Sequence, residues 1–376
     1  MSRESGTGEG IDTPASQANR TLGPLIPADK IIIGYLATIA GLVALSAGSI
    51  RYWWVFLAGH AAAIAVIILI ASYHRRAGAS SRSLAGLVHA WYALLLVPLT
   101  YKELTYLIPL VHPRDFDWEL AAIDHRILGV HPTVWLERVT SPLLTEILQL
   151  SYITYYFLPL LLGVTMWRKG WFREFHFFLF VVVLGFYLSY LGYVAVPAIG
   201  PRFILADQHT APLSGIWTFE RIRVSLDQAE GITRDCFPSG HVELSLLVLY
   251  YARKFHRKIF WWILPAVSLL IISTVYLRYH YVIDVVAGAV LAGLIVVAAG
   301  PLYRVLGGGS RDQRPEVRGR KSEVRSRKSE VRDQRSEVRG QKSEVRGRRS
   351  EVGGQRSEIR DQRSEIRNQR SEGSPL

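Results

Sequence analysis

Two histidines in the sequence stand beside residues that suit the handling of an anion. The first is His241 in the stretch RDCFPSGHVELSLL, where a polar segment runs into an apolar one. Pro238 suits the first turn of a helix, because the amide proton that proline lacks would have no partner there. Ser239 and Gly240 then present a hydroxyl and backbone amides at the positive end of the helix dipole, which favours an anion. His241 can donate a proton to the group that leaves that anion.

The second histidine lies in the stretch TVYLRYHYVIDVVAG, together with Arg278 and Asp284. His280 and Asp284 are four residues apart, so their side chains share one face of a helix. A carboxylate beside an imidazole fixes the tautomer and favours the protonated form, as the orienting acid does in a hydrolase triad. The same spacing also fits an Asp–His pair whose only role is to join two helices.

A third feature is Arg202, in the stretch VPAIGPRF. Its guanidinium is a planar, permanently charged fork that matches phosphate oxygens, although an interfacial arginine that reaches lipid headgroups has the same sequence signature. Ionisable residues at membrane depth are costly unless they are paired, and they indicate function. An arginine, a Ser-Gly-His at a helix start and a His–Asp pair together predict phosphoryl transfer through a phosphohistidine.

The elements that must position these residues are long apolar segments. The sequence is 49% hydrophobic, and its apolar residues gather in eight blocks close to the roughly 18 residues that a transmembrane helix needs. Only α-helices and closed β-barrels satisfy their backbone inside lipid, so we predict an all-α polytopic membrane protein. The predicted spans are 31–50, 53–72, 84–101, 144–167, 175–196, 238–252, 259–278 and 282–305.

Basic loops predict which side of the membrane each end of these spans faces. Short loops rich in lysine and arginine stay cytoplasmic, and 74–82, 168–173 and 253–258 are such loops. With the N-terminus inside, they follow the second, fourth and sixth spans, and the basic tail follows the eighth. We therefore predict a multi-pass protein of the cell (inner) membrane, with both termini cytoplasmic and the three motifs facing the periplasm or exterior. The segment 115–139 on that outer side reads either as an interfacial amphipathic helix or as a long loop.

The C-terminal tail accounts for most of the chain's charge. Residues 311–376 carry +8 of the net charge of +13, so the basic balance is no evidence for a nucleic-acid partner. The tail repeats heptads such as RKSEVRS, which offer one apolar position where a coiled coil needs two. We predict disorder there, or a basic repeat lying on anionic lipids of the inner leaflet. Cys236 is the only cysteine, which excludes an intrachain disulfide, and we expect it to be inert.

The motif PSGH, with the histidine of HYVID 39 residues after its own, resembles the type 2 phosphatidic acid phosphatase superfamily of membrane enzymes. The resemblance covers about 84–305 and implies that His280 is the nucleophile, that Asp284 orients it and that His241 is the general acid. It also implies that no metal or other cofactor is needed. The residues that it implies for holding the phosphate are Arg202, Ser239 and Gly240.

The sequence departs from that family's pattern at three positions. Ala195 stands where the first motif has lysine, and Phe203 stands where proline follows the arginine. Thr274 stands where the third motif has arginine, and Arg278, one helical turn further on, is our candidate replacement for binding phosphate. The stretches PAIGPR, PSGH and RYHYVID resemble most closely the branch that contains inositol phosphorylceramide synthases, which transfer a phosphorylated headgroup between lipids.

These observations predict four parts of the chain. They are a disordered cytoplasmic N-terminus (1–30), two extra transmembrane helices (31–83), a six-helix lipid phosphatase or phosphotransferase core (84–305), and a basic disordered tail (306–376). The predicted substrate is a lipid phosphate in the membrane; water as acceptor gives a phosphatase, and a lipid alcohol gives a transferase. Two alternatives are a non-enzymatic carrier or scaffold, and a vanadate-dependent haloperoxidase, which is typically soluble.

Overall fold

The computed structural model describes residues 25–76, 83–230 and 234–308, together with seven residues of the tail at 354, 356 and 360–364. The predicted N-terminal disorder up to residue 24 and almost all of the heptad tail lie outside these described residues. The first helix begins at Pro27, four residues before the predicted start of the first span. The described residues form α-helices and short 3-10 helices and contain no strand, which confirms the all-α class.

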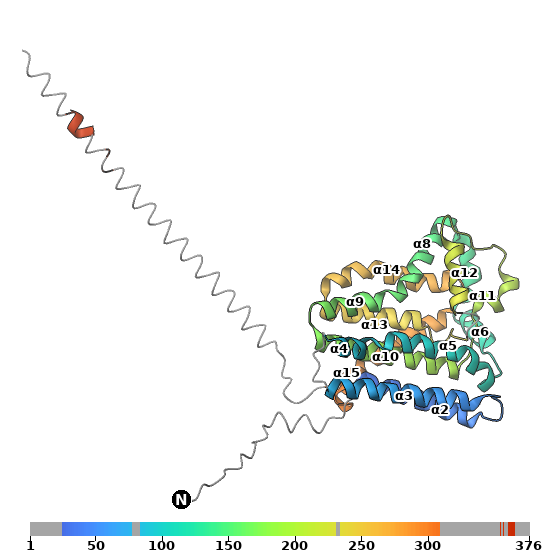
Figure 1. Cartoon of the computed structure of the whole chain (residues 1–376). Helices are drawn as coiled ribbons and strands as arrows, with labels where there is room; N and C mark the ends of the chain where they lie inside the picture. The colour runs from blue at the N-terminus through green and yellow to red at the C-terminus, as the bar shows by residue number, and fades with distance from the viewer. Residues whose placement is uncertain are drawn as a thin grey trace, which may run out of the picture. The chain divides into compact units, whose positions relative to one another are not determined.

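Ten helices make the bundle in the described part of residues 25–308 (Figure 1), and seven further helices, most of them short, connect them. The bundle helices are α2 (Pro27–Leu45), α3 (Trp53–Arg76), α4 (Leu84–Trp91), α5 (Ala93–Val111), α8 (Pro142–Ile153), α9 (Leu158–Arg168), α10 (Phe172–Ala195), α13 (Gly240–Phe255), α14 (Arg257–Tyr276) and α15 (Val282–Val305). The connecting helices are α6 (Asp117–Leu128), α7 (Pro132–Trp135), η1 (Leu136–Val139), η2 (Thr154–Tyr156), α11 (Pro201–Ile204), η3 (Ala206–Gln208) and α12 (Phe219–Glu230).

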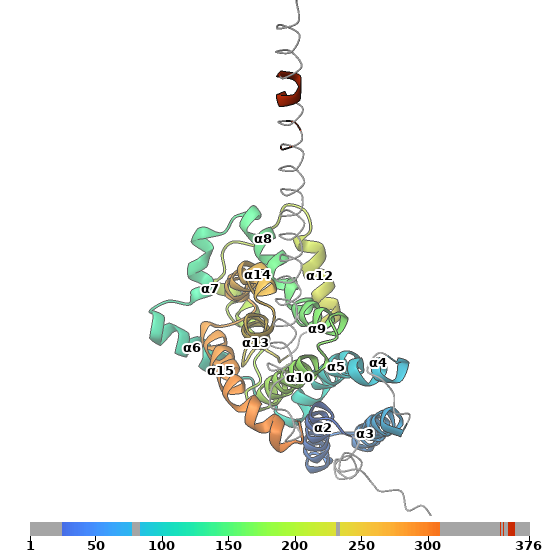
Figure 2. The ribbon, with the colours of Figure 1, turned by 90° about the vertical axis from the view of Figure 1, so that its left-hand side faces the viewer.

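Helix α13, which follows the PSGH motif, lies in the middle of the bundle. It packs against α9, α10, α14 and α15, and the view of Figure 2 shows these helices around it. The side chains between them form one apolar core that includes Phe180, Leu247, Val267 and Ile295. This burial fixes α13 between its neighbours, so the start of the helix has a defined position at one end of the bundle.

The two extra helices α2 and α3 pack on the opposite side of α10. Helix α2 contacts α3 and α10, and a second apolar core containing Ile32, Leu36 and Tyr187 joins them to α5. Asp29, fully buried at the start of α2, accepts hydrogen bonds from Tyr92 at 2.7 Å and lies 2.9 Å from Nε2 of His89. The extra pair is therefore attached by a buried polar contact as well as by apolar packing.

The structure supports six or seven of the eight predicted spans. Six helical segments are long and apolar enough to cross a membrane, which confirms a polytopic membrane protein. A seventh is the pair α8–η2 and α9, which bends by 45°. The eighth predicted span, α13, has only 16 residues and falls short of a full crossing. The PSGH motif thus lies at the start of a short helix.

The ends of the helices fall into two groups. At one end, Nζ of Lys169 lies 2.7 Å from Nε2 of His256, so two of the predicted cytoplasmic loops adjoin each other. At the same end, Nζ of Lys30 near the start of α2 donates to the carbonyl oxygen of Leu306 after α15, at 2.8 Å. The helices α6, α11 and α12 gather at the other end, on the right of Figure 1. The segments that carry Arg202, His241 and His280 meet there.

Candidate active site

The two histidines predicted from separate motifs face each other. Nε2 of His280, in the turn before α15, lies 3.4 Å from Nδ1 of His241 in the first turn of α13. Both side chains are buried, at 3% and 9% exposed. Nε2 of His241 is buried without a hydrogen-bond partner in the described part of the chain. Two imidazoles at this distance can act on one substrate atom and its neighbour.

The start of α13 is fixed by side-chain capping and by close contact with α15. Oγ of Ser239 caps the helix by accepting from the amide of Val242, and the amide of Ser239 donates to the carbonyl oxygen of Asp284 at 3.1 Å. A Cβ on Gly288 would lie 2.4 Å from the carbonyl oxygen of Ser239, so only glycine permits this approach. The glycine of the PSGH motif, Gly240, is the first residue of α13.

His280 has a defined orientation, and a carbonyl oxygen lies nearer to its Nδ1 than the predicted partner Asp284 does. Nδ1 of His280 lies 2.9 Å from the carbonyl oxygen of Cys236, whereas the nearest oxygen of Asp284 is 3.6 Å away. An imidazole nitrogen next to a carbonyl oxygen must carry the proton, so Nδ1 is the donor and Nε2 keeps its lone pair toward His241. Oδ2 of Asp284 accepts instead from the amide of Tyr281 and from the thiol of Cys236, both at 2.8 Å.

Arg202 reaches the same place from α11 but is already paired. Its Nη1 donates to Oδ1 of Asp227 on α12 at 2.8 Å, and its guanidinium lies over the rings of Phe203 and Tyr279. Its backbone amide donates to the carbonyl oxygen of Arg278, which ties the first motif to the third. Arg202 thus lies beside the histidines, with a carboxylate in the position that an anion would take.

The guanidinium of Arg278 is hydrogen-bonded to two of the loops at the histidine end of the bundle. Its Nη2 donates to Oε1 of Glu137 at 2.8 Å and to the carbonyl oxygen of Ala211 at 2.7 Å, while its buried Nε has no partner in the described residues. Burial would raise the pKa of Glu137, but hydrogen bonds from Thr210 and Ala211 and the charge of Arg278 outweigh it and hold the pKa below its usual value. His209 nearby has its pKa lowered to about 4 by burial and by the charge of Arg278.

Two carboxylates on α6 hold the loops of the site, and sequence analysis missed both. Asp117 accepts from the amides of Ile199 and Gly200, which lead into Arg202. Asp124 accepts from the amides of Val282 and Ile283 in the first turn of α15. Burial raises the pKa of each carboxyl group above its usual value although these amides favour the ionised form. The segment 115–139 is therefore structural support for the site rather than a free loop.

Aromatic rings close the site around the histidines. The rings of Tyr152 and Tyr155 lie 4.5 and 4.2 Å from that of His241, and Tyr152 also stacks on Tyr279. The polar cavity between Arg202, Arg278 and the two histidines has a volume of only about 40 Å³.

The thiol of Cys236, the ring of His280 and the carboxylate of Asp284 are the one group in the described residues with the spacing of a metal site. Their ligand atoms lie within 4.8 Å of one another. The thiol and carboxylate atoms are 2.8 Å apart, whereas two ligands on one tetrahedral zinc would be separated by about 3.5 Å. The contact has the length of a hydrogen bond, so these residues do not fit a zinc ion as they stand.

Comparisons with known proteins indicate one superfamily. Residues 118–298 match the family described as the PAP2 superfamily. A PA-phosphatase related-family protein of Dictyostelium discoideum is 28% identical over 171 residues, which is 38% of this chain and 30% of that relative. No solved structure matches the chain. The matches name the superfamily and no branch within it, so the resemblance to inositol phosphorylceramide synthases stays a prediction. Through residues 118–298, which hold both histidines, the chain belongs to the PAP2 superfamily.

Proposed function

We propose that this protein transfers a phosphoryl group from a lipid phosphate through a phosphohistidine at His280. The observation that supports this most directly is the facing pair of imidazoles, with Nε2 of His280 3.4 Å from His241. The carbonyl oxygen of Cys236 at 2.9 Å holds Nδ1 in its protonated form, which leaves the Nε2 lone pair free to attack phosphorus.

The proposed reaction has two steps. In the first, the lone pair of His280 Nε2 forms a bond to phosphorus, the bond from phosphorus to the lipid oxygen breaks, and His241 donates its proton to that oxygen. In the second, His241 accepts a proton from the incoming hydroxyl group, whose oxygen forms a bond to phosphorus while the bond to His280 breaks. Arg202, Arg278, Ser239 and Gly240 are the proposed ligands of the phosphate oxygens, which gain charge in each transition state.

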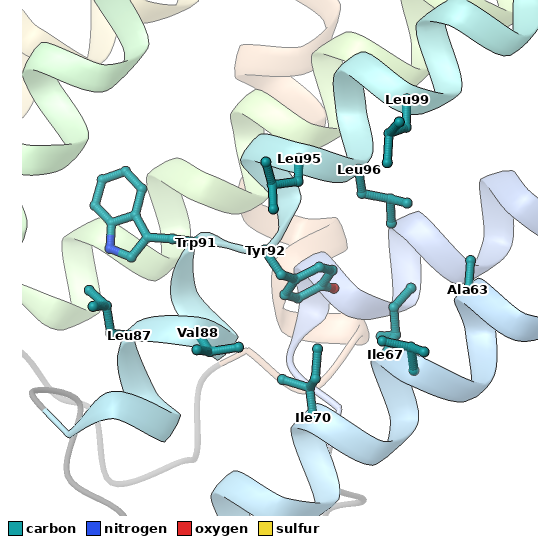
Figure 3. Close-up of a pocket in the computed structure, with 11 residues that line it drawn as sticks. Ala63, Ile67, Ile70, Leu87, Val88, Trp91, Tyr92, Leu95, Leu96 and Leu99 are labelled. Carbon is teal, nitrogen blue, oxygen red and sulfur yellow. The ribbon is translucent and has the colours of Figure 1, made fainter.

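An apolar cavity that reaches His241 supports a lipid substrate. It has a volume of about 510 Å³ and lies between α5, η2, α9 and α10, with a mainly apolar lining that includes Leu94, Val97, Phe186 and Tyr190. A cavity of this kind suits a hydrocarbon chain whose phosphate end lies at the histidines. A second apolar groove lies between α3 and α4–α5 (Figure 3), and none of its lining residues belongs to the proposed site.

The location of the site is also part of this proposal. Two of the loops rich in lysine and arginine, 168–173 and 253–258, lie at the helix ends opposite the histidines. By the positive-inside rule this supports a cytoplasmic position for those two loops. The active site then faces the periplasm or exterior of the cell (inner) membrane, and both termini are cytoplasmic. Cysteine introduced at exposed Trp118 on α6 is expected to react with a membrane-impermeant maleimide added to intact cells.

The test of the function is phosphate release by the purified protein in detergent from phosphatidate, phosphatidylglycerol phosphate and isoprenyl diphosphates. We expect His280→Ala to abolish release and His241→Ala to lower it by about 10²-fold or more, as for other general acids. His112→Ala is the control, since His112 is half-buried just after α5 and its contacts in the described residues are with the nearby Arg114 and Phe116. Release by His280→Ala protein at the parent's rate would overturn the assignment and favour a non-enzymatic role.

The acceptor is decided by the products. We propose water or a lipid alcohol, because the same groups serve both second steps, and the sequence resemblance favours the alcohol. Reactions with and without added diacylglycerol or ceramide are compared by mass spectrometry. Free phosphate alone indicates hydrolysis, and a new lipid that carries the phosphorylated headgroup indicates transfer.

A further inference from the structure

Cys236 touches both members of the acid–histidine pair, although the proposed reaction gives its thiol no role. It lies in the loop before α13 and is 2% exposed. Its Sγ donates to Oδ2 of Asp284 at 2.8 Å, and its backbone carbonyl oxygen accepts from Nδ1 of His280 at 2.9 Å. One residue therefore bonds to the carboxylate through its side chain and to the imidazole through its main chain.

The direct contact between the carboxylate and the imidazole is weaker than this indirect one. Oδ2 of Asp284 is 3.6 Å from Nδ1 of His280, which is beyond the length of a normal hydrogen bond. The same Oδ2 is held by the amide of Tyr281 at 2.8 Å, so the carboxylate is itself fixed to the start of α15. The rigid connection from Asp284 to the ring runs through the thiol and then through the carbonyl group of Cys236.

The nearest acceptor of the Cys236 thiol is the carboxylate of Asp284. Sγ also lies 3.4 Å from the carbonyl oxygen of Tyr279 and 3.7 Å from Nδ1 of His280, and a Cβ on Gly200 would lie 3.6 Å from it. Burial raises the pKa of the Cys236 thiol well above its usual value, and the charge of Asp284 and the bond to it raise the pKa further. Both effects favour the protonated thiol, which is the form that donates to Asp284.

We propose that Cys236 is a positioning residue for phosphoryl transfer: its thiol binds Asp284 and thereby holds the carbonyl group that fixes the tautomer of His280. This inference rests on the proposed function. Without the thiol proton, Cys236 loses its side-chain bond to the carboxylate, and its carbonyl group is held less firmly against Nδ1 of His280. The backbone amides of Cys236 and Ser239 still bind the carbonyl oxygens of Ala198 and Asp284, so the loop itself stays in place. Fewer molecules then present the Nε2 lone pair to phosphorus, while the groups that bind substrate are unaffected.

Three substitutions separate this role from simple packing. Cys236→Ser keeps a donor, Cys236→Ala removes it, and Cys236→Val removes it while filling the volume. We expect kcat to fall about 10-fold or more in the Ala and Val proteins, with KM within about 2-fold of the parent, and the Ser protein to stay within about 3-fold. If Val matches the parent, Cys236 only fills space; if folded Ser protein is as slow as Ala, the donor is not what matters. Either result overturns the proposal.

A second pair of measurements keeps the test decisive. On an Asp284→Ala background, Cys236→Ala should lower kcat by less than about 2-fold further, because the thiol acts through that carboxylate; full additivity would contradict the proposal. The chain has one cysteine, so its S–H stretching band in the infrared is single. That band should shift in Asp284→Ala protein, and an unchanged band would show that the contact is absent. If the parent releases no phosphate from any lipid, the proposed function fails, and the band still reports on the contact.

Discussion

The contact between Arg202 and Asp227 predicts that removing the acid will improve anion binding. Asp227 binds Nη1 of Arg202 at 2.8 Å, so a phosphate oxygen that approaches this side of the guanidinium competes with the carboxylate for it. The two side chains are 23% and 42% exposed, and pairs of this exposure contribute about 0.2–1 kcal/mol. Asp227→Asn should therefore tighten anion binding by roughly 1.4- to 5-fold, since 1.4 kcal/mol corresponds to about 10-fold.

The assay is the inhibition constant of inorganic phosphate in the phosphate-release reaction, together with KM for a short-chain lipid phosphate. Asp207→Asn is the control, because Asp207 on η3 is exposed and its loss changes the net charge equally. Lowering the ionic strength should change the inhibition constant of phosphate in both proteins, whereas only Asp227→Asn frees the guanidinium of Arg202. Weaker binding in Asp227→Asn would refute the reasoning and show that the acid orients Arg202. Equal effects in both proteins would show that only long-range charge matters.

Further predictions concern the packing of α13 and the ion pair of Glu137. Gly288→Ala should destabilise the protein by about 1–3 kcal/mol and lower activity, because its Cβ would displace the carbonyl of Ser239, whereas Gly293→Ala on the same helix meets nothing within 4 Å. Thermal unfolding measures the stability of the two variants, and phosphate release measures their activity. Equal stability and activity in Gly288→Ala and Gly293→Ala would contradict the close contact between α13 and α15. Glu137→Gln should be less stable than the parent at neutral pH. Because the folded pKa of Glu137 is lowered, the deficit should shrink only as the pH falls below the ordinary value of 4.5, and a deficit that grows with acid would refute the assignment.

Much of the fold follows from features that are local in the sequence. Apolar segments of the length of a span can satisfy their backbone in lipid only as helices, so the class and the span positions were predictable. The motif around His241 was recognisable because proline, serine and glycine favour a helix start. The bend of 45° between α8 and α9 was not, because it depends on how the two pieces pack against α13 and α14.

The site divides in the same way. The residue types and spacings of His241, His280 and Arg202 indicated an anion site, and the bundle brings them to one end. The partners of the site's arginines come from segments that carry no motif. Glu137, the partner of Arg278, follows α7, and Asp227, the partner of Arg202, lies on α12. Their hydrogen bonds join residues that are 141 and 25 positions apart in the chain.

The sequence by itself determined that the protein is a helical membrane protein and predicted an anion site with two histidines, because apolar length and side-chain type are local properties. Only the tertiary structure decided which atom each group faces. His280 turns its Nδ1 to the carbonyl of Cys236 rather than to Asp284, which is nearer in the chain, because the loop before α13 is pressed against the start of α15. Such a choice depends on differences of less than 1 Å between competing partners, and packing sets these differences.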